Sequence, residues 1–180
     1  MELLSGIDLS TLAILKYPDP RLKVPAAEIG AIDDDIRRLA GRMLEILYAA
    51  HGVGLAATQV GIPLRVFVAN PAGEPGPDEA VYINPRIVDQ DGTTLQDEGC
   101  LSFPGITTKI KRRKKVTLRA VNLEGESFEQ TRQDLPARIF QHEMDHLDGV
   151  LLVDRMSIIA RISNRWTLKD LEERFAAKDH

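Results

Sequence analysis

The stretch Gln141-His142-Glu143-Met144-Asp145-His146 decides the fold, and it lies in a longer run that ends at Gly149. His142 and His146 stand four residues apart. On a helix this spacing places both imidazoles on one face, where they can bind one metal ion. Gly149 is a typical residue just beyond a helix end. The run therefore predicts a helix that carries two metal ligands.

Two carboxylates flank these histidines, and the spacing alone does not choose between them. At roughly 100° per residue, Glu143 and Asp145 lie about equally far from the bisector of the two imidazoles. Glu143 has the longer side chain. It also occupies the position at which the His-Glu-x-x-His motif carries the carboxylate that takes a proton from the attacking water. We therefore expect Glu143 to be the base.

The motif alone leaves a catalytic metal site incomplete, because such a site needs three protein ligands and one open position. The extended metzincin motif requires a third histidine where this chain has Leu152, so that interpretation is excluded. Two kinds of third ligand remain: a downstream carboxylate, Glu172 or Glu173, and the single cysteine, Cys100. The residues by themselves leave this choice open.

The composition limits the class of protein. A chain of 180 residues with 43% hydrophobic and 28% charged residues is typical of one globular domain. A net charge of -4 gives no general attraction to nucleic acid or to anionic membranes, and one cysteine excludes an internal disulfide. No apolar run approaches the roughly 20 residues that span a membrane. The first eight residues contain acids rather than a basic segment, so we expect no secretory signal.

The patterns along the chain predict an α+β fold. We expect an extended segment over residues 12–25, where prolines disfavour a helix, and an amphipathic helix over residues 33–50. Strands are expected over residues 64–69, 80–88, 93–102, 115–121 and 126–132, and a further amphipathic helix over residues 157–178. Consecutive short strands predict antiparallel β-sheets packed around the central helix with the two histidines, plus the C-terminal helix.

Two other segments have unusual sequences. The stretch from His51 to Gly61 contains a relaxed dinucleotide-binding fingerprint, but a helix precedes it where a strand is required, so we expect close approach of its backbone instead. Gln59 in this stretch carries a carboxamide that can donate to an oxyanion. The basic run Lys109–Lys115 is typical of a strand edge guarded by lysines, with contact to RNA as the alternative.

Three segments together resemble the signature motifs of the peptide deformylases: Gly52-Val53-Gly54-Leu55-Ala56-Ala57-Thr58-Gln59, Glu98-Gly99-Cys100-Leu101-Ser102 and Gln141-His142-Glu143-Met144-Asp145-His146. They occur in the family's order, and the similarity runs from about Leu12 to Val153. The resemblance implies a metal-dependent hydrolase that removes the formyl group from the N-terminal formylmethionine of newly synthesised polypeptides and releases formate. One departure is the sequence Gly105-Ile106-Thr107-Thr108, where some members carry polar and basic residues. It leaves the substrate contacts of this loop open.

Carried over by position, the resemblance assigns roles to individual residues. It implies Cys100, His142 and His146 as metal ligands, Glu143 as acid and base, and Gln59 with the N–H of Leu101 as donors to the formyl oxygen. It implies substrate contacts for Val53, Gly54, Gly99 and Arg112. Leu135 and Ile139 share the face of the histidines one and two turns earlier, so we expect them to line a pocket for the methionine side chain.

The resemblance also implies the cofactor and the partners. Fe²⁺ is the first choice of metal, with Ni²⁺, Co²⁺ or Zn²⁺ as replacements. Formylmethionyl nascent peptides are the expected substrates, and the ribosome near its tunnel exit is a further expected partner. We expect no membrane, no direct DNA binding, a bacterial cytoplasm, or else the interior of an organelle, and one catalytic domain over residues 1–180 with a motif-bearing core at 12–153 and a helical extension at 154–180.

Two other classes remain open on the residues alone. One is an endopeptidase that uses Glu172 or Glu173 as its third metal ligand. The other is an RNA-binding module with a structural metal site, which the run Lys109–Lys115 favours.

Overall fold

A computed structural model describes residue 4 and residues 6–177 of the chain. Residues 1–3, part of the start for which the sequence predicts no secretory signal, and residue 178, the predicted end of the last helix, lie outside them. The main helices are α1 (Asp34–Ala49), α2 (Asp134–Leu147), α3 (Leu152–Arg155), α4 (Ile158–Ser163) and α5 (Arg165–Ala176). Short 3-10 helices are η1 (Leu9–Thr11), η2 (Pro20–Lys23) and η3 (Ala57–Val60).

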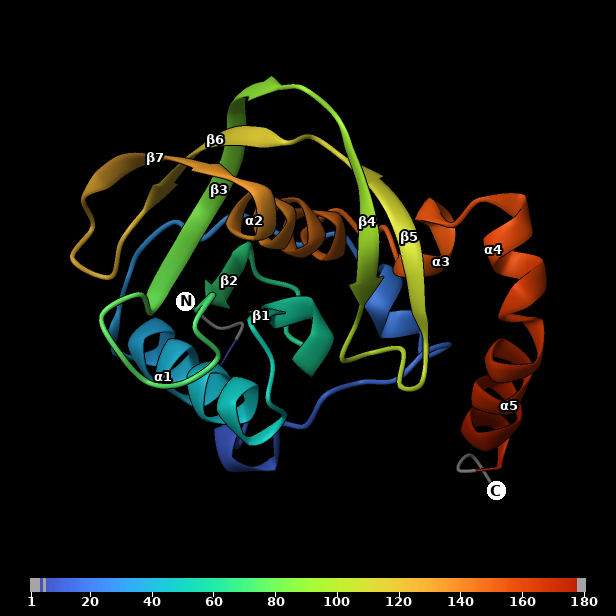
Figure 1. Cartoon of the computed structure of the whole chain (residues 1–180). Coiled ribbons are helices and arrows are strands. Elements are labelled where there is room, and N and C mark those ends of the chain that lie inside the picture. The colour runs from blue at the N-terminus through green and yellow to red at the C-terminus, as the bar shows by residue number, and fades with distance from the viewer. Residues whose placement is uncertain (1–3, 5, 178–180) are drawn as a thin grey trace.

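The strands form two separate antiparallel sheets (Figure 1). The larger sheet has the order β1-β2-β3-β6-β7, built from β1 (Gly54–Ala56), β2 (Val66–Ala69), β3 (Ala80–Asp91), β6 (Lys115–Val121) and β7 (Ser127–Gln133). The smaller sheet is a hairpin of β4 (Thr94–Gly99) and β5 (Thr107–Arg112). The expected α+β architecture is therefore confirmed.

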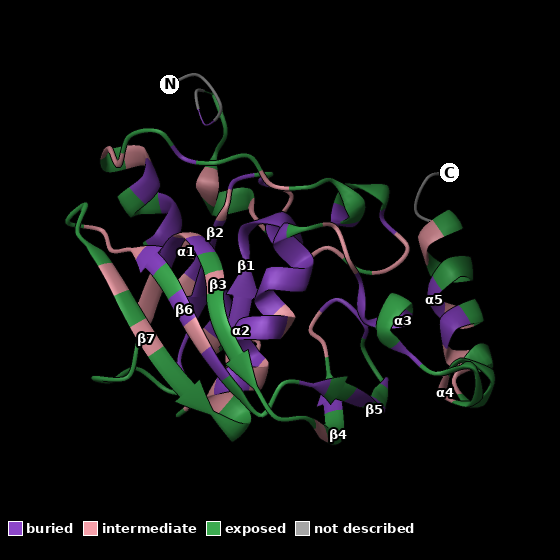
Figure 2. Cartoon of the chain, turned by 90° about the horizontal axis from the view of Figure 1, so that it is seen from above, coloured by how far each residue is buried: buried purple, intermediate pink, exposed green. Residues whose placement is uncertain are grey.

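Helix α2 lies at the centre of the molecule, between the larger sheet and the β4–β5 hairpin (Figure 1). Every residue from Ile139 to Leu147 is buried except His142, which is half-buried, and Figure 2 shows this helix in the interior. Leu147 and Phe140 pack on the apolar face of the sheet with Phe67 and Leu118. Apolar packing against the sheet therefore positions the helix independently of its polar contacts.

Helix α1 follows its sequence pattern closely. The side chain of Asp33 accepts a hydrogen bond from the backbone N–H of Ile36 at 3.0 Å, which caps the first turn. The apolar stripe predicted from the sequence is buried on the second side of the sheet in one cluster with Leu55 and Val68. The two helices thus cover opposite apolar surfaces of the same short strands.

Several elements differ from the sequence-based expectation. Strand β1 is not among the expected strands, because its three consecutive buried residues show no alternation of polar and apolar side chains. Strand β5 coincides with part of the basic run and not with any of the expected strands. The segment over residues 12–25, expected to be extended, contains η2, which begins at Pro20 behind the capping side chain of Asp19.

The C-terminal helix is broken into two. The side-chain amide of Asn164 donates to the carbonyl of Ala160 at 2.9 Å and ends α4, and α5 begins at the next residue. Leu168 and Leu171 are buried as expected, whereas Ile162 and Trp166 of the same predicted stripe are 55% and 66% exposed. Among the described residues, none of the helices combines the length and the apolar character that crossing a membrane would require.

Candidate metal centre and substrate cavity

One side-chain cluster has the composition of a metal site. The ligand atoms of Cys100, His142 and His146 all lie within 4.8 Å of one another. The Sγ atom of Cys100 is 3.3 Å from Nε2 of His146, and two such ligands of one tetrahedral ion stand about 3.6 Å apart. A thiolate and two imidazoles suit the late divalent transition metals. The residues present therefore fit the metal ion that the motifs imply.

The two carboxylates that the sequence left as alternative third ligands lie elsewhere. Glu172 accepts a hydrogen bond from the hydroxyl of Tyr17 at 2.9 Å, and Glu173 forms an ion pair with Lys169 at 3.5 Å. Both belong to α5, on the outside of the molecule (Figure 1). The alternative of a thermolysin-like carboxylate ligand is wrong for this chain.

The three ligands come from two layers of the fold. Helix α2 supplies both histidines, whose rings lie with centroids 5.0 Å apart. Cys100 immediately follows β4, in a turn closed by the hydrogen bond from the N–H of Phe103 to the carbonyl of Cys100 at 2.9 Å. The backbone N–H of Ser102 donates to the sulfur at 3.4 Å. This hydrogen bond fixes the position of the sulfur beside the two imidazoles.

A buried ion-pair network contacts His142, the first histidine of the motif. Arg112 donates to Glu98 at 3.0 Å through both Nε and Nη2, and to Asp145 at 2.6 Å through Nη1. Oε2 of Glu98 in turn lies 3.3 Å from Nδ1 of His142. Burial would raise the pKa of Glu98, but the hydrogen bonds to His142 and Arg112 and the charge of Arg112 lower this pKa to about 2. Glu98 is therefore a carboxylate that fixes the ring of His142.

This network also includes Asp145, the second carboxylate of the motif. Asp145 accepts hydrogen bonds from Arg112 and, at 2.5 Å, from Arg155, and it does not line the cavity that Glu143 lines. Arg112, for which a substrate contact was expected, is 5% exposed and is held between its two carboxylate partners. It does not line the substrate cavity described next. Its buried position is explained by its central place between two anions.

A cavity of about 510 Å³ opens beside the metal ligands. Its walls include all the other residues that were expected to touch the substrate: Val53, Gly54, Gln59, Gly99, Leu101, Leu135 and Ile139. Gly105, Ile106 and Thr107 also line it, so the loop that departs from the family pattern forms part of the wall. Arg138, for which no role was expected, lies at the same cavity and donates to the carbonyl of Asp97 at 3.0 Å.

Glu143 lines this cavity and has the properties of a proton carrier. It is 2% exposed, and its Oε2 atom has no hydrogen-bond partner among the described residues. Burial raises the pKa of the Glu143 carboxyl to about 7, against the opposing charges of His142 and Arg112. A group with this pKa can both accept and release a proton near neutral pH. Burial also lowers the pKa of His146, which keeps its ring in the neutral form that binds metals.

Gly54 is required by the close approach of its backbone to Glu143. A Cβ atom at this position would lie 2.4 Å from Oε1 of Glu143 and 3.0 Å from Cγ2 of Ile139. Only a glycine therefore lets β1 run directly alongside the carboxylate, as the glycine-rich sequence predicted.

The two expected oxyanion donors are held in position by neighbouring backbone. Oε1 of Gln59 accepts a hydrogen bond from the N–H of Ala56 at 2.9 Å, so that its NH₂ group is directed toward Ser102 Oγ, at 3.2 Å, and Cys100 Sγ, at 3.7 Å. This amide orientation leaves its N–H groups facing the metal ligands.

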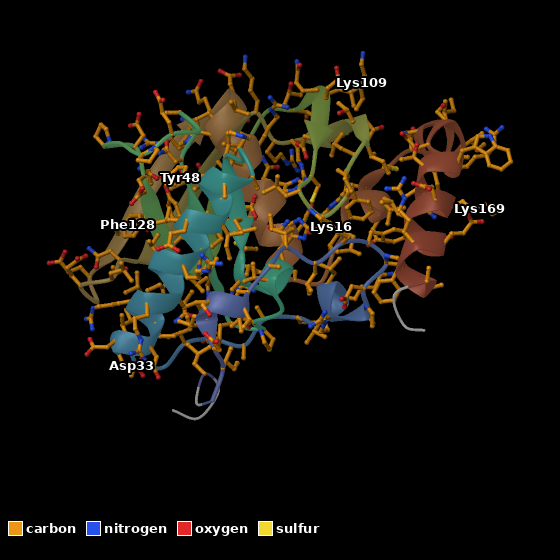
Figure 3. All side chains as sticks on the ribbon, turned by 90° about the horizontal axis from the view of Figure 1, so that it is seen from below. Lys16, Asp33, Tyr48, Lys109, Phe128 and Lys169 are labelled. Atoms are coloured by element: carbon orange, nitrogen blue, oxygen red, sulfur yellow. The ribbon has the colours of Figure 1, made fainter. Side chains whose placement is uncertain are left out.

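The N-terminal segment binds both donor segments by hydrogen bonds that were not predicted from the sequence. The N–H of Leu15 donates to the carbonyl of Gln59 at 2.8 Å, and the N–H of Tyr17 donates to that of Ser102 at 2.9 Å. Between them, Nζ of Lys16 donates to the carbonyl of Leu101 at 2.6 Å. Figure 3 labels Lys16 on this segment, where it crosses the molecule. These contacts use backbone carbonyls, which no side-chain motif reveals.

Comparisons with known proteins agree with this geometry. The family model described as "Polypeptide deformylase" matches residues 11–161. The peptide deformylase of Alkalilimnicola ehrlichii is 47% identical over 163 residues, which cover 91% of this chain and 92% of that protein. Peptide deformylase 1B of Arabidopsis thaliana, a chloroplastic and mitochondrial protein, is 43% identical over 93% of this chain and 62% of that protein.

Solved structures of peptide deformylases share this fold. A crystal structure of plant peptide deformylase PDF1B superposes with a TM-score of 0.91 at 42% sequence identity, covering 94% of this chain and 93% of that one. The chain therefore belongs to the peptide deformylase family, hydrolases that remove the N-formyl group from the N-terminal formylmethionine of nascent polypeptides.

Proposed function

We propose that deformylation takes place in the cavity beside α2, with Cys100, His142 and His146 as the metal ligands and Glu143 as the residue that moves the proton. One observation carries this assignment. A buried carboxyl with a pKa of about 7 and an oxygen without a partner among the described residues lies at the same cavity as a cluster of one thiol and two imidazoles. A buried carboxyl with a raised pKa beside a cavity is typical of an acid or base in catalysis.

In the proposed reaction, Glu143 accepts a proton from the attacking water and delivers it to the departing amine. When bound, the metal ion supplies a Lewis acid that polarises the formyl group and lowers the pKa of water. The carboxamide of Gln59 and the N–H of Leu101 donate to the formyl oxygen as negative charge develops on it. Since both donors are fixed before the substrate arrives, they need little reorganisation during the reaction.

The backbone of the substrate would pair with two strand edges. Strand β1 is the end strand of the larger sheet, and β4 pairs only with β5 among the described residues, so each retains an edge that pairs with no described strand. Val53, Gly54 and Gly99 belong to these edges or adjoin them and line the same cavity. An extended peptide between the edges completes both ladders. Leu135 and Ile139 would then form the apolar wall for the methionine side chain.

Arg112 is proposed to act through Glu98 rather than on the substrate. Its guanidinium holds the carboxylate that contacts Nδ1 of His142, and so it orients a metal ligand from two residues away. It is a positioning residue in this scheme.

Fe²⁺ is the ion that we propose for the site, with Ni²⁺, Co²⁺ or Zn²⁺ as replacements. The mixed thiolate and imidazole donors support a late divalent transition metal rather than Mg²⁺ or Ca²⁺. Metal analysis of protein purified without oxygen will identify the ion.

We further propose the partners and the location. Formylmethionyl peptides meet the enzyme as they leave the ribosome, in the cytoplasm of a bacterium, and the Alkalilimnicola relative supports this location. The interior of an organelle is the alternative that the chloroplastic and mitochondrial relative supports. We propose that residues 1–180 act as one catalytic domain, with the site within residues 12–153 and a helical extension over residues 154–180.

The test compares three variants for formate release from a formylmethionyl peptide and for metal content, under anaerobic conditions. Glu143→Gln is expected to keep its metal and to lose roughly 10²- to 10⁴-fold in kcat, because the proton carrier is removed. Cys100→Ser is expected to lose metal, since a hydroxyl replaces the thiolate. Glu173→Gln is the matched control and should equal the parent protein. Unchanged turnover in Glu143→Gln would contradict the proposed role.

A further inference from the structure

A second cavity, of about 670 Å³, lies on the opposite side of α2 from the substrate cavity, and its walls are strongly basic. Six of its thirteen lining residues are lysine or arginine, whereas the whole chain has 23 in 180. They come from four segments of the chain: Arg65 before β2, Arg86 in β3, Lys111, Arg112 and Arg113 around the end of β5, and Arg155 in α3. Cations from four segments cannot be explained as lysines that guard one strand edge.

The positive charge of this basic cavity is only partly neutralised. Two carboxylates line it, Asp145 and Asp148, and they pair with Arg112, Arg155 and Arg65. Two more, Glu28 and Glu98, reach Arg86 and Arg112 from outside the lining. Six cations against four anions leave an excess of two positive charges, on a chain whose net charge is -4.

The excess corresponds to two particular side chains. Lys111 and Arg113 line the cavity, and neither forms an ion pair with any residue in the described part of the chain. Lys111 is exposed on β5, and Arg113 is held by its backbone, whose N–H donates to Gln141 at 2.8 Å. Both side chains are thus available to a ligand while their backbone stays fixed.

We propose that the basic cavity binds a phosphate-bearing anion. Guanidinium groups match phosphate oxygens with two parallel hydrogen bonds, and a lysine adds a point charge. The cavity is larger than one phosphate group needs. Its uncharged polar side chains, Gln90 and Thr93, add donors beside the cations. The anion is either a small phosphate compound or the phosphodiester chain of RNA, and both present the same oxygens.

The sequence run Lys109–Lys115 offers a matched pair of double variants for the test. Lys111→Ala with Arg113→Ala removes the two cations of the cavity that have no ion pair. Lys109→Ala with Lys114→Ala removes the same charge from the same run at positions that do not line the cavity. Figure 3 shows Lys109 on the outer edge of the hairpin. All four side chains are exposed, so each variant is expected to fold as the parent does.

The experiment titrates the metal-loaded parent and both variants at fixed ionic strength. One arm uses inorganic pyrophosphate in a calorimeter, and the other uses a labelled uridine hexanucleotide followed by fluorescence anisotropy. Loss of the cavity pair should weaken binding by about tenfold to a hundredfold, as expected for two charge-assisted contacts, while the control pair changes Kd by less than about threefold. In the RNA arm, the slope of log K against log salt should fall by roughly 1.4, or about 0.7 for each lost phosphate contact.

The two arms identify the source of the phosphate. Binding of pyrophosphate that depends on the cavity pair supports a small phosphate compound, and binding of the hexanucleotide alone with the same dependence supports RNA. Equal weakening in both variants would show diffuse attraction to the basic run. Equal affinity in all three proteins would show binding at the metal ion instead. Either of these results, or no binding in either arm, overturns the proposal.

Discussion

Helices α2 and α5 are similar in length and are both amphipathic in sequence, yet they bury different kinds of side chain. On α2 the buried residues include Gln141, Glu143, Asp145 and His146. On α5 only Leu168 and Leu171 are buried, and Trp166 remains 66% exposed. Figure 2 shows α5 at the edge of the molecule, largely exposed. The first helix is surrounded by two sheets, and the second is covered on one side only.

This difference shows where a helix can keep polar side chains buried. Burying a polar side chain costs free energy unless it is paired, so a helix retains several of them only where a network or a reaction uses them. On α2, Asp145 is paired with two arginines and Gln141 with the backbone of Arg113. Two buried polar atoms of α2 have no hydrogen-bond partner among the described residues, Oε2 of Glu143 and Nδ1 of His146, and both residues belong to the proposed active site. On α5 no such atom occurs among the described residues.

The largest effect is expected from Arg112→Met, which removes the cation shared by Glu98 and Asp145. A carboxylate left buried without its partner destabilises the protein, and we expect the free energy of unfolding to fall by about 3–5 kcal/mol. Urea denaturation of the metal-free protein measures it. Arg119→Met is the matched control, because Arg119 and its partner Glu129 are 58% and 49% exposed and such pairs contribute about 0–1 kcal/mol. Equal losses in the two variants would remove the distinction between the buried network and a surface pair.

Gly54→Ala tests how tightly β1 and α2 approach each other. The added methyl group would meet the carboxylate of Glu143 at 2.4 Å and displace it, and a displacement of this kind lowers kcat by roughly 100-fold. Formate release measures the loss. In Gly41→Ala, on the exposed face of α1, the methyl group meets no atom within 4 Å, so this variant should keep full activity and gain up to about 1 kcal/mol of stability. Full activity in Gly54→Ala would mean that Glu143 needs no fixed position.

Leu171→Ala examines how firmly α5 is attached. Leu171 is 6% exposed and packs in one cluster with Phe103 and Ile106 of the cavity wall. A loss of about 2–3 kcal/mol in the free energy of unfolding is expected for a leucine buried in this way. A loss below about 1 kcal/mol would show that α5 separates from the core before the rest of the molecule unfolds.

The smallest effect is expected from Trp166→Ala. Trp166 is mostly exposed, and its ring has a cation–π contact with its neighbour Arg165 at 5.1 Å. We expect the midpoint of thermal unfolding and the rate of formate release to stay near those of the parent, with a change of stability within about 0.5 kcal/mol. A change as large as that of Leu171→Ala would place both faces of α5 in the core.

The sequence predicted the features that depend on local periodicity. The spacing of His142 and His146 placed both on one helix face, and the stripe of α1 predicted its buried side. The choice between Glu143 and Asp145 needed the structure, because the arginines that neutralise Asp145 come from β5 and α3. Local patterns carry no information on such distant partners.

The surroundings of other residues could not be predicted for a related reason. Position in a motif assigned a substrate contact to Arg112, although its charge is enclosed by two buried anions. Lys16 was missed because it acts on a backbone carbonyl, which every residue possesses. The convergence of Cys100 with the two histidines followed only from resemblance to a family, since the spacing of a lone cysteine says nothing about its neighbours in space.

The placement of the three proposed metal ligands has a thermodynamic consequence. Two of them belong to the central helix, and the third follows a strand of the small, separate hairpin. An ion held by all three ties that hairpin to the helix, and its binding free energy adds to the free energy that keeps the two parts together. Chelation therefore releases the hairpin first, and amide hydrogen exchange in β4 and β5 reports the loss of the ion before the larger sheet responds.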